Sequence, residues 1–528
     1  MLRRVETEGG GPRFMMLETI REYAAERLGA QPELAAAAYR AHATYFANFA
    51  QEQWRDLDGL RRDPALAAMT ADVENLRAAW RHWVGQKDLA ELNKLVDGLW
   101  LLYDAKGWSH ATIELTRDLL SVLSSAPSTP ENAAQEVMLR TSLARALLAV
   151  HGYTREVEKA YEKALELSEA NPEVAQLFPV LRGLASFYMA RAQLDKEVEI
   201  GRDMLRLAQA QDDPVIRVHG HLVVGRCTGF QGDLRGGLEH LDQAIASFES
   251  QGYSSRRFLL GPNPAVACLT TSALFLWLLG YPDRALERAD RALRLSTDLG
   301  HPFTLAFALF HSGYLHVWRR EPELAADRAR RVLEVAAKHD LPVWTAVGTC
   351  LLGAAETGLG SPEEGLGRIR RGLDLYRNLT TPPVFWPLLL YIHAEGCARA
   401  GRPADGVDLI DEALEIAGSA PSANHPLAPM LLVLRGDLLL AAQQAPEVDP
   451  DGLFQQAFHL AAVVDARMLQ LRAAVRLCRL SRDRGDAEEG DAALRAVYET
   501  FTEGFETADL LEAKSLLDST SHPVGRHE

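Results

Sequence analysis

Histidine residues give the nearest approach to a metal-binding pattern in this sequence. The triplet His219–His221 reads HGH, and His311 and His316 stand five residues apart. A pair of zinc ligands on a helix needs a spacing of about four residues, together with carboxylate or cysteine partners. Neither group meets both conditions. We therefore interpret these histidines as solvated or core side chains and expect no metal and no cofactor.

Residues for covalent or acid-base catalysis are present without the arrangement that such catalysis requires. The five cysteines stand far apart with no CxxC pair, and no GxSxG turn is found. Each cysteine falls in a segment expected to be helical, where it is usually a small buried side chain. The acidic run Asp486–Asp491 is typical of a solvated surface. We expect no catalytic residue, and the chain is predicted not to be an enzyme.

Nucleotide and nucleic-acid binding are not indicated either. The sequence contains no GxxxxGK[ST] motif, and Gly9–Gly11 lack the lysine and the preceding strand that a phosphate cradle needs. Lys and Arg total 56 and Asp and Glu total 72, which gives a net charge of −16 over 528 residues. A field of this sign repels a phosphate backbone, so we expect this chain alone to bind no nucleic acid.

The sequence shows no pattern for secretion or for membrane insertion. The N-terminus does not combine basic residues, an apolar run and a cleavage site, and no run of about 20 apolar residues could span a bilayer. Scattered single cysteines suit a reducing compartment. We therefore expect a cytoplasmic protein with no membrane partner.

A repeat of about 40 residues runs through most of the chain. We take one turn position in each repeat as its marker. Small residues recur seven residues before each marker and five residues after most of them. Such residues let two antiparallel helices cross closely. Between markers, apolar residues fall three and four apart, as in a helix. The markers, at intervals of 40, 48, 40, 40 and 41 residues, are Ala192, Gly232, Gly280, Arg320, Gly360 and Gly401.

Prolines support this division into helical hairpins, because proline suits the first turn of a helix. They stand 22 residues after several markers, at Pro214, Pro302, Pro342 and Pro382, with Pro262 eight residues further along after an insertion. The unit resembles the tetratricopeptide pattern, whose standard length is about 34 residues. We predict an all-α, tetratricopeptide-like α-solenoid: a right-handed superhelix of about nine helical hairpins over residues 132–518.

The N-terminal residues hold the candidate for β-structure. Leu2–Val5 and Arg13–Leu17 flank the turn-rich sequence ETEGGG, and the helical pattern of Leu17–Leu28 follows directly. This order predicts a short β-hairpin that leads into a helix.

Several segments resemble one family. RFMMLETIREYAAERL (Arg13–Leu28) resembles the end of the winged-helix domain in bacterial STAND-type predicted ATPases. ADVENLRAAWRHWV (Ala71–Val84) and LWLLYDAKGW (Leu99–Trp108) look like the helical region that joins this winged helix to the repeats. VYETFTEGFETADLLEAKSLLDS (Val497–Ser519) and LGHPFTLAFALF (Leu299–Phe310) are similar to bacterial cyclase–ATPase–tetratricopeptide proteins.

The resemblance implies a multidomain regulator in which an ATPase domain lies upstream and this chain is the sensor or interaction arm. Such an arm is a non-catalytic scaffold that binds a protein, a peptide or a small-molecule effector. Its parts would be a partial winged-helix end (1–28, with the β-hairpin as remnant), a helical linker region (29–131), the repeat array (132–518) and a disordered tail (519–528).

Two alternatives stay open. The chain could be a DNA-binding transcriptional regulator in its own right, which the partial winged helix favours and the negative charge and missing recognition helix oppose. It could also be part of an adenylate or guanylate cyclase whose catalytic domain is not in this chain. A stand-alone scaffold and a truncated gene are further interpretations of the same pattern.

The first helix of each hairpin lines the concave surface in tetratricopeptide arrays, which selects positions about 13, 10, 6 and 3 residues before each marker. Aromatic residues meet a few polar groups there, a mixture that suits a peptide or a small ligand. The competing interpretation is that these aromatic side chains pack between superhelical turns. The candidate groove residues are His219, Arg226, Thr270, Trp277, Phe307, Phe310, Tyr314, Tyr391 and Glu395.

Overall fold

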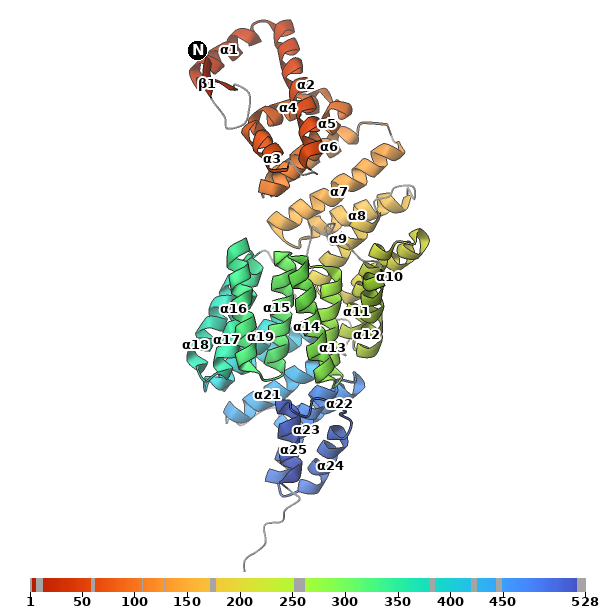
Figure 1. Cartoon of the computed structure of the whole chain (residues 1–528), viewed down its shortest axis with the longest axis vertical. Helices are drawn as coiled ribbons and strands as arrows, with labels where there is room; N and C mark the ends of the chain where they lie inside the picture. The colour runs from red at the N-terminus through yellow and green to blue at the C-terminus, as the bar shows by residue number, and fades with distance from the viewer. Residues whose placement is uncertain are drawn as a thin grey trace, which may run out of the picture. The chain divides into compact units, whose positions relative to one another are not determined.

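The computed structural model describes residues 2–5, 13–57, 62–106, 108–127, 129–170, 177–250, 262–379, 385–418, 425–442 and 449–519 (Figure 1). The chain divides into two compact units, Met1–Val180 and Leu181–Glu528. The four parts expected from the sequence follow motifs rather than compactness, so their boundaries stay predictions. Apart from Ser519, the expected disordered tail lies outside the described residues.

The first unit begins with the predicted β-hairpin and continues as helices. Strand β1 pairs antiparallel with β2, with Leu2 opposite Met16. The helices pack around the buried Trp80 and Trp83, and the indole of Trp80 donates to Asp118 over 3.1 Å. The elements are β1 (Leu2–Val5), β2 (Arg13–Met16), α1 (Glu18–Gly29), α2 (Pro32–Leu57), α3 (Arg62–Ala71), α4 (Val73–Gln86), α5 (Leu89–Lys106), α6 (Ser109–Leu123), α7 (Pro130–His151) and α8 (Arg155–Ala170).

The second unit is an all-α, tetratricopeptide-like solenoid, as predicted. From α10 (Leu194–Gln211) to α25 (Ala508–Asp518), each helix packs against the next one along the chain. The unit starts within α9 (Leu177–Ala190). The following helices are α10 (Leu194–Gln211), α11 (Pro214–Phe230), α12 (Leu234–Ser250), α13 (Pro264–Leu278), α14 (Pro282–Leu299), α15 (Pro302–Trp318), α16 (Pro322–His339), α17 (Pro342–Gly358), α18 (Pro362–Arg377), α19 (Trp386–Arg399), α20 (Pro403–Gly418), α21 (Ala428–Ala442), α22 (Pro450–Val463), α23 (Arg467–Asp483), α24 (Ala487–Tyr498) and α25 (Ala508–Asp518).

The six marker residues stand where one helix of a hairpin turns into the next. All six have a positive φ, between 54° and 105°. Four of them are glycines, which adopt this conformation without steric cost, whereas Ala192 and Arg320 adopt it against their preference. The repeat register derived from the sequence therefore marks the tight turn of each hairpin.

Prolines begin helices at most of the expected positions. Pro214, Pro302 and Pro342 are the first residues of α11, α15 and α17. Pro382 lies outside the described residues. The prediction was wrong for Pro262, because α13 begins at Pro264 and the side chain of Asn263 caps it by accepting from the N–H of Ala265 and Val266.

Small residues sit where the two helices of a hairpin cross. A Cβ atom on Gly353 of α17 would lie 2.6 Å from the carbonyl oxygen of Gly365 on α18, and a Cβ on Gly365 would lie 2.6 Å from that of Gly353. The pair formed by Gly225 and Gly237 is equally close, at 2.8 and 2.6 Å. Both backbones are in contact, so no larger residue fits without moving a helix.

We predict that Gly365→Ala lowers the stability of the second unit by about 2 kcal/mol, since the new methyl group meets backbone atoms that cannot move alone. Gly367→Ala is the matched control: it lies two residues away in α18 and has nothing within 4 Å. Its better helix propensity should raise stability by about 0.5–1 kcal/mol. Urea denaturation followed by circular dichroism measures both, and an equal response of the two variants would contradict the close crossing.

Candidate functional site

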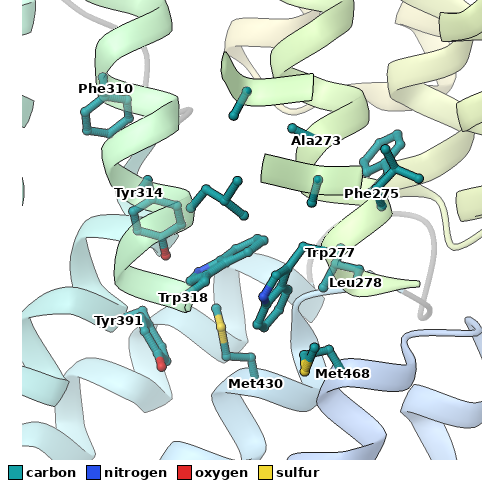
Figure 2. Packing of buried hydrophobic residues seen from close by; sticks show 14 of the residues in the cluster. Ala273, Phe275, Trp277, Leu278, Phe310, Tyr314, Trp318, Tyr391, Met430 and Met468 are labelled. Carbon is teal, nitrogen blue, oxygen red and sulfur yellow. The ribbon is translucent and has the colours of Figure 1, made fainter. Parts of the chain in front are cut away.

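Four of the candidate groove residues are core residues. Trp277 and Phe310 are 0% exposed, and Thr270 and Tyr314 are 2% exposed. The indole rings of Trp277 and Trp318 have centroids 4.8 Å apart, and Tyr314 meets Trp318 edge-on at 5.1 Å. Figure 2 shows Met430 and Met468, from α21 and α23, lying beneath the two indoles. For these four residues the structure favours the competing interpretation, in which the side chains pack between helices.

His219 and Arg226 both lie on α11, where His219 is buried and Arg226 forms an ion pair with α10. Burial lowers the pKa of His219 to about 3, so the imidazole is neutral at physiological pH. Arg226 pairs with Glu197 of α10, whose side chain is fully buried. A buried ion pair of this kind is kept because removal of one partner would leave the other charge unpaired. Neither residue faces a cavity described below.

Phe307 is half-buried in a cluster of aromatic rings on α15. Its ring centroid lies 4.1 Å from that of His311 and 5.9 Å from that of Trp344. His311 donates from Nδ1 to the carbonyl oxygen of Phe307 over 2.8 Å. Burial lowers the pKa of His311 to about 4, and this hydrogen bond offsets part of the effect. His311 is thus a neutral packing residue of this cluster.

Tyr391 and Glu395, the remaining two candidates, line a cavity of about 200 Å³ in the second unit. Both lie on α19, and the opposite wall comes from α21 and α23. About half of the lining is apolar and half is charged. The other lining residues are Val317, Arg320, Arg399, Met430, Val433, Leu434, Asp437, Leu469, Arg472, Arg476 and Asp509.

Ion pairs hold the charged side chains around this cavity. Arg472 donates to both carboxylate oxygens of Asp509, over 3.0 and 2.8 Å, while its guanidinium carbon lies 4.9 Å from the ring centroid of Trp277. The Asp437 carboxylate accepts from Nη2 of Arg476 over 3.0 Å. Glu395 accepts from Arg399, one helical turn away, over 2.7 Å. These bonds fix the arginines in place before any ligand arrives.

The cavity exists because the C-terminal helices return to the middle of the solenoid. Helix α23 packs against α13, and Arg320 after α15 pairs with Glu512 of α25. In Figure 1, α22 and α23 lie beside the ends of α13 and α14. The contacts join residues about 150–230 positions apart, as in the 2.6 Å bond from Arg235 to Asp465. The solenoid therefore closes on itself between α13 and α25.

Glu503 makes the most specific of these closing contacts. Its Oε1 accepts from the backbone N–H of Asp283 and of Arg284, both over 3.0 Å, at the start of α14. Helix α14 has no side-chain cap of its own, so Glu503 satisfies donors that would otherwise lack a partner in the protein. Gly504 completes the contact by donating from its N–H to Asp283 over 2.9 Å.

Several cavity residues were missed by the sequence reasoning: Arg320, Arg472, Arg476 and Asp509. Two signals could have indicated them. Arg320 is the one charged residue among the markers, and Arg472 and Arg476 are spaced four apart on a helix. Their partner Asp509 belongs to the segment Val497–Ser519 that carries a family resemblance, but the period of the repeat does not predict what this segment touches.

The cysteines and histidines that the sequence analysis considered for catalysis or metal binding can also be placed in the structure. All five cysteines are buried, and burial raises the pKa of Cys350 to about 12. His316 Nδ1 lies 2.6 Å from the carboxylate of Glu321. Within the described ranges, no three His, Cys, Asp or Glu residues are grouped as a metal site would require. No helix of the described part is long and apolar enough to cross a membrane.

Comparison with known proteins does not establish a family for this chain. No protein-family model matches the chain, and no characterised protein matches it in sequence. Solved structures with a similar fold are tetratricopeptide-like repeat proteins. The Rap protein complexed with competence and sporulation factor is 12% identical with a TM-score of 0.47, and covers 75% of this chain and 99% of its own.

Two further solved structures match at lower TM-scores. The apo form of the quorum sensor NprR from B. thuringiensis is 15% identical, with a TM-score of 0.40, over 69% of this chain and 98% of its own. The STAND protein PH0952 from Pyrococcus horikoshii, which has a tetratricopeptide repeat sensor, is 12% identical with a TM-score of 0.40, over 81% of this chain and 64% of its own. At these identities the likeness concerns the fold alone.

We predict that Gly504→Ala weakens the closure of the solenoid. Gly504 has a φ of +77°, and a Cβ atom there would lie 2.0 Å from Cγ of Pro282. Gly485→Ala is the matched control, because its φ is +83° but nothing lies within 4 Å. The left-handed conformation should cost each variant about 1 kcal/mol, and the clash should add about 2 kcal/mol for Gly504→Ala.

Hydrogen–deuterium exchange of the two variants measures this effect. In Gly504→Ala, we expect amides of α23 and α25 to exchange faster than in Gly485→Ala, together with a lower thermal unfolding midpoint. Equal exchange in both variants would show that the contact with Pro282 does not hold the C-terminal helices.

Proposed function

We propose that this chain is a non-catalytic repeat scaffold that binds a short peptide segment or a small molecule in the closed interior of its second unit. The observation that carries the proposal is the cavity of about 200 Å³ lined by residues of α15, α19, α21, α23 and α25 and by Arg320. It combines five aliphatic residues with seven charged ones, more polar than a typical ligand site, and ion pairs hold the charged groups in fixed positions where they can orient a ligand.

A simple packing defect would have a different lining. Dry voids in proteins are apolar, whereas this cavity exposes four arginines, three carboxylates and a tyrosine. Charged groups held inside a protein need partners or solvent. The cavity therefore holds water in the free protein, and a ligand with matching polar groups would replace that water.

The location of the cavity also suits a sensor. Its walls come from helices that are distant in the sequence and that meet because the solenoid closes. A ligand that contacts α19, α21 and α23 together favours the closed arrangement over any arrangement in which these helices separate. Binding would thus be coupled to the conformation of the repeat array.

We further propose that this scaffold serves as the sensor or interaction arm of a STAND-type signalling ATPase. The support comes from the sequence: Arg13–Leu28 resembles the end of the winged helix in that family, and Val497–Ser519 resembles its C-terminal end. The second segment also takes part in the closure of the solenoid, because Glu503 contacts the start of α14 and Asp509 lies 3.6 Å from Arg320.

We predict that a bulky side chain at Met430 abolishes binding. The probe is a pool of random synthetic hexapeptides, half with free and half with amidated C-termini, measured with the full chain by native mass spectrometry. Met430→Trp fills part of the cavity and should lose the peptide adducts that the wild type forms. Leu375→Trp is the control, because Leu375 is 46% exposed on α18.

Circular dichroism checks that both tryptophan variants remain folded. Peptide adducts that survive in Met430→Trp, or that are absent from the wild type at millimolar pool concentration, would contradict the cavity as the binding site.

The proposed membership of a STAND regulator predicts a P-loop in the same reading frame. Sequencing of the genomic DNA and of the transcript upstream of the codon for Met1 tests this. A GxxxxGK[ST] motif encoded in frame supports the proposal. A transcript with stop codons upstream and no such motif would overturn it, while leaving the binding proposal unaffected.

A further inference from the structure

Two arginines on α23 present unused hydrogen-bond donors beside the cavity. Arg472 and Arg476 are four residues apart on α23, and both line the cavity. Arg472 uses Nε and Nη2 to bind Asp509, and Arg476 uses Nε and Nη2 to bind Asp437. Among the described residues, Nη1 of neither arginine makes a hydrogen bond, and neither atom is sealed in the interior. Both therefore have donors left for an incoming acceptor.

The two guanidinium groups lie close enough to repel each other. Burial and the positive charge of Arg472 lower the pKa of Arg476, while the carboxylates of Asp437 and Glu512 raise it, and the net shift is upward. The repulsion is a cost that an anion between the two side chains would relieve. Pairs of arginines held in this way are typical of sites for carboxylates, which accept two parallel hydrogen bonds.

Tyr391 adds a donor on the facing helix. Its side chain is 8% exposed, and its hydroxyl makes no hydrogen bond with the described residues and is not sealed off from the cavity. Burial raises the pKa of Tyr391, the carboxylates of Glu395 and Asp437 raise it further, and Arg472 and Arg399 lower it, so the phenol stays protonated and can donate. The phenol of Tyr391 and the arginines of α23 thus face one cavity from two sides.

The charge balance of the lining also favours an anion. Four arginines and three carboxylates line the cavity, and each of these carboxylates has an arginine partner. The fourth arginine, Arg320, pairs with Glu512, which is not part of the lining, and its Nη1 also lies 3.6 Å from Oδ1 of Asp509. Counted over the lining residues alone, the excess is one positive charge, and each carboxylate of the lining already has an arginine partner.

The rest of the wall is aliphatic. Met430, Leu434 and Leu469, with Val317 and Val433, supply apolar contact area from three helices. They are rigid, because Met430 is 4% exposed and Leu469 is fully buried in the core. A ligand that matches this wall has an aliphatic group next to its charged end.

We propose that the cavity binds a carboxylate attached to an aliphatic group, with the carboxylate between Arg472, Arg476 and Tyr391 and the aliphatic group against Met430, Leu434 and Leu469. The C-terminal residue of a peptide and a free aliphatic acid share this chemistry. The inference rests on the proposed function, since it names the ligand class of the same site.

The experiment compares matched probes that differ in charge. The probes are a random hexapeptide pool ending in leucine with a free C-terminus, the same pool with a C-terminal amide, N-acetyl-leucine and N-acetyl-leucine amide. Native mass spectrometry and isothermal titration with the full chain measure binding. We expect each carboxylate probe to bind at least tenfold more tightly than its amide, because charge-assisted hydrogen bonds are the stronger ones.

Three variants test whether the preference for carboxylates over amides comes from the arginines of the cavity. Arg476→Gln should weaken the carboxylate probes at least tenfold and leave the amides unchanged. Asp437→Asn should bind carboxylates at least as tightly as the wild type, since Asp437 no longer competes for Arg476. Arg484→Gln, a control whose side chain is 58% exposed outside the cavity, should bind like the wild type. Circular dichroism and the amide probes verify that each variant is folded.

The outcomes separate this inference from the proposed function. If N-acetyl-leucine binds as tightly as the peptides, the source is a small acid; if only the peptides bind, it is a peptide terminus; both support the inference. Amides that bind as well as acids, with both lost in Met430→Trp, overturn the carboxylate inference and leave the binding cavity in place. If no probe binds at millimolar concentration, the proposed function fails and the inference with it.

Discussion

Backbone contact between the two helices of each hairpin is the constraint on which the rest of the second unit depends. Gly353 and Gly365 approach so closely that either Cβ atom would meet a carbonyl oxygen at 2.6 Å. This contact fixes how the two helices cross, and stacked hairpins with a fixed crossing accumulate a constant curvature. The curvature returns α23 to α13, and that return creates the cavity. The cavity thus depends on glycines at these crossings, since a larger side chain would force the two helices apart.

The repeat could be predicted from the sequence because it depends on local features. A residue at the turn has a positive φ, small residues lie at the crossing, and proline starts a helix, so each leaves a mark at a fixed spacing. The contacts that close the solenoid between α13 and α25 leave no periodic pattern in the sequence. Glu503 caps α14 about 220 residues earlier in the chain, and no periodicity relates the two. The family resemblance indicated that Val497–Ser519 is distinctive, but not what it contacts.

The candidate site could be predicted in part for the same reason. Counting back from the markers selected positions on the first helices of the hairpins, and two of the selected residues, Tyr391 and Glu395, line the cavity. The same rule assumes an open concave surface. Because α21 and α23 cover that surface, Trp277 and Tyr314 became core residues that share a buried cluster with Met430 and Met468. The arginines of α23 were missed because the degenerate C-terminal repeats gave no register there.

Closure also bears on how such a protein can evolve. Repeat arrays ordinarily gain or lose units by duplication and deletion, because each unit contacts its neighbours alone. In this chain, Arg472 reaches the carbonyl of Trp318, and Arg320 reaches Glu512. One additional hairpin between α15 and α23 would carry Arg472 and Glu512 away from both partners. The number of hairpins in this stretch is therefore expected to stay constant among its descendants, while hairpins before α11 remain free to vary.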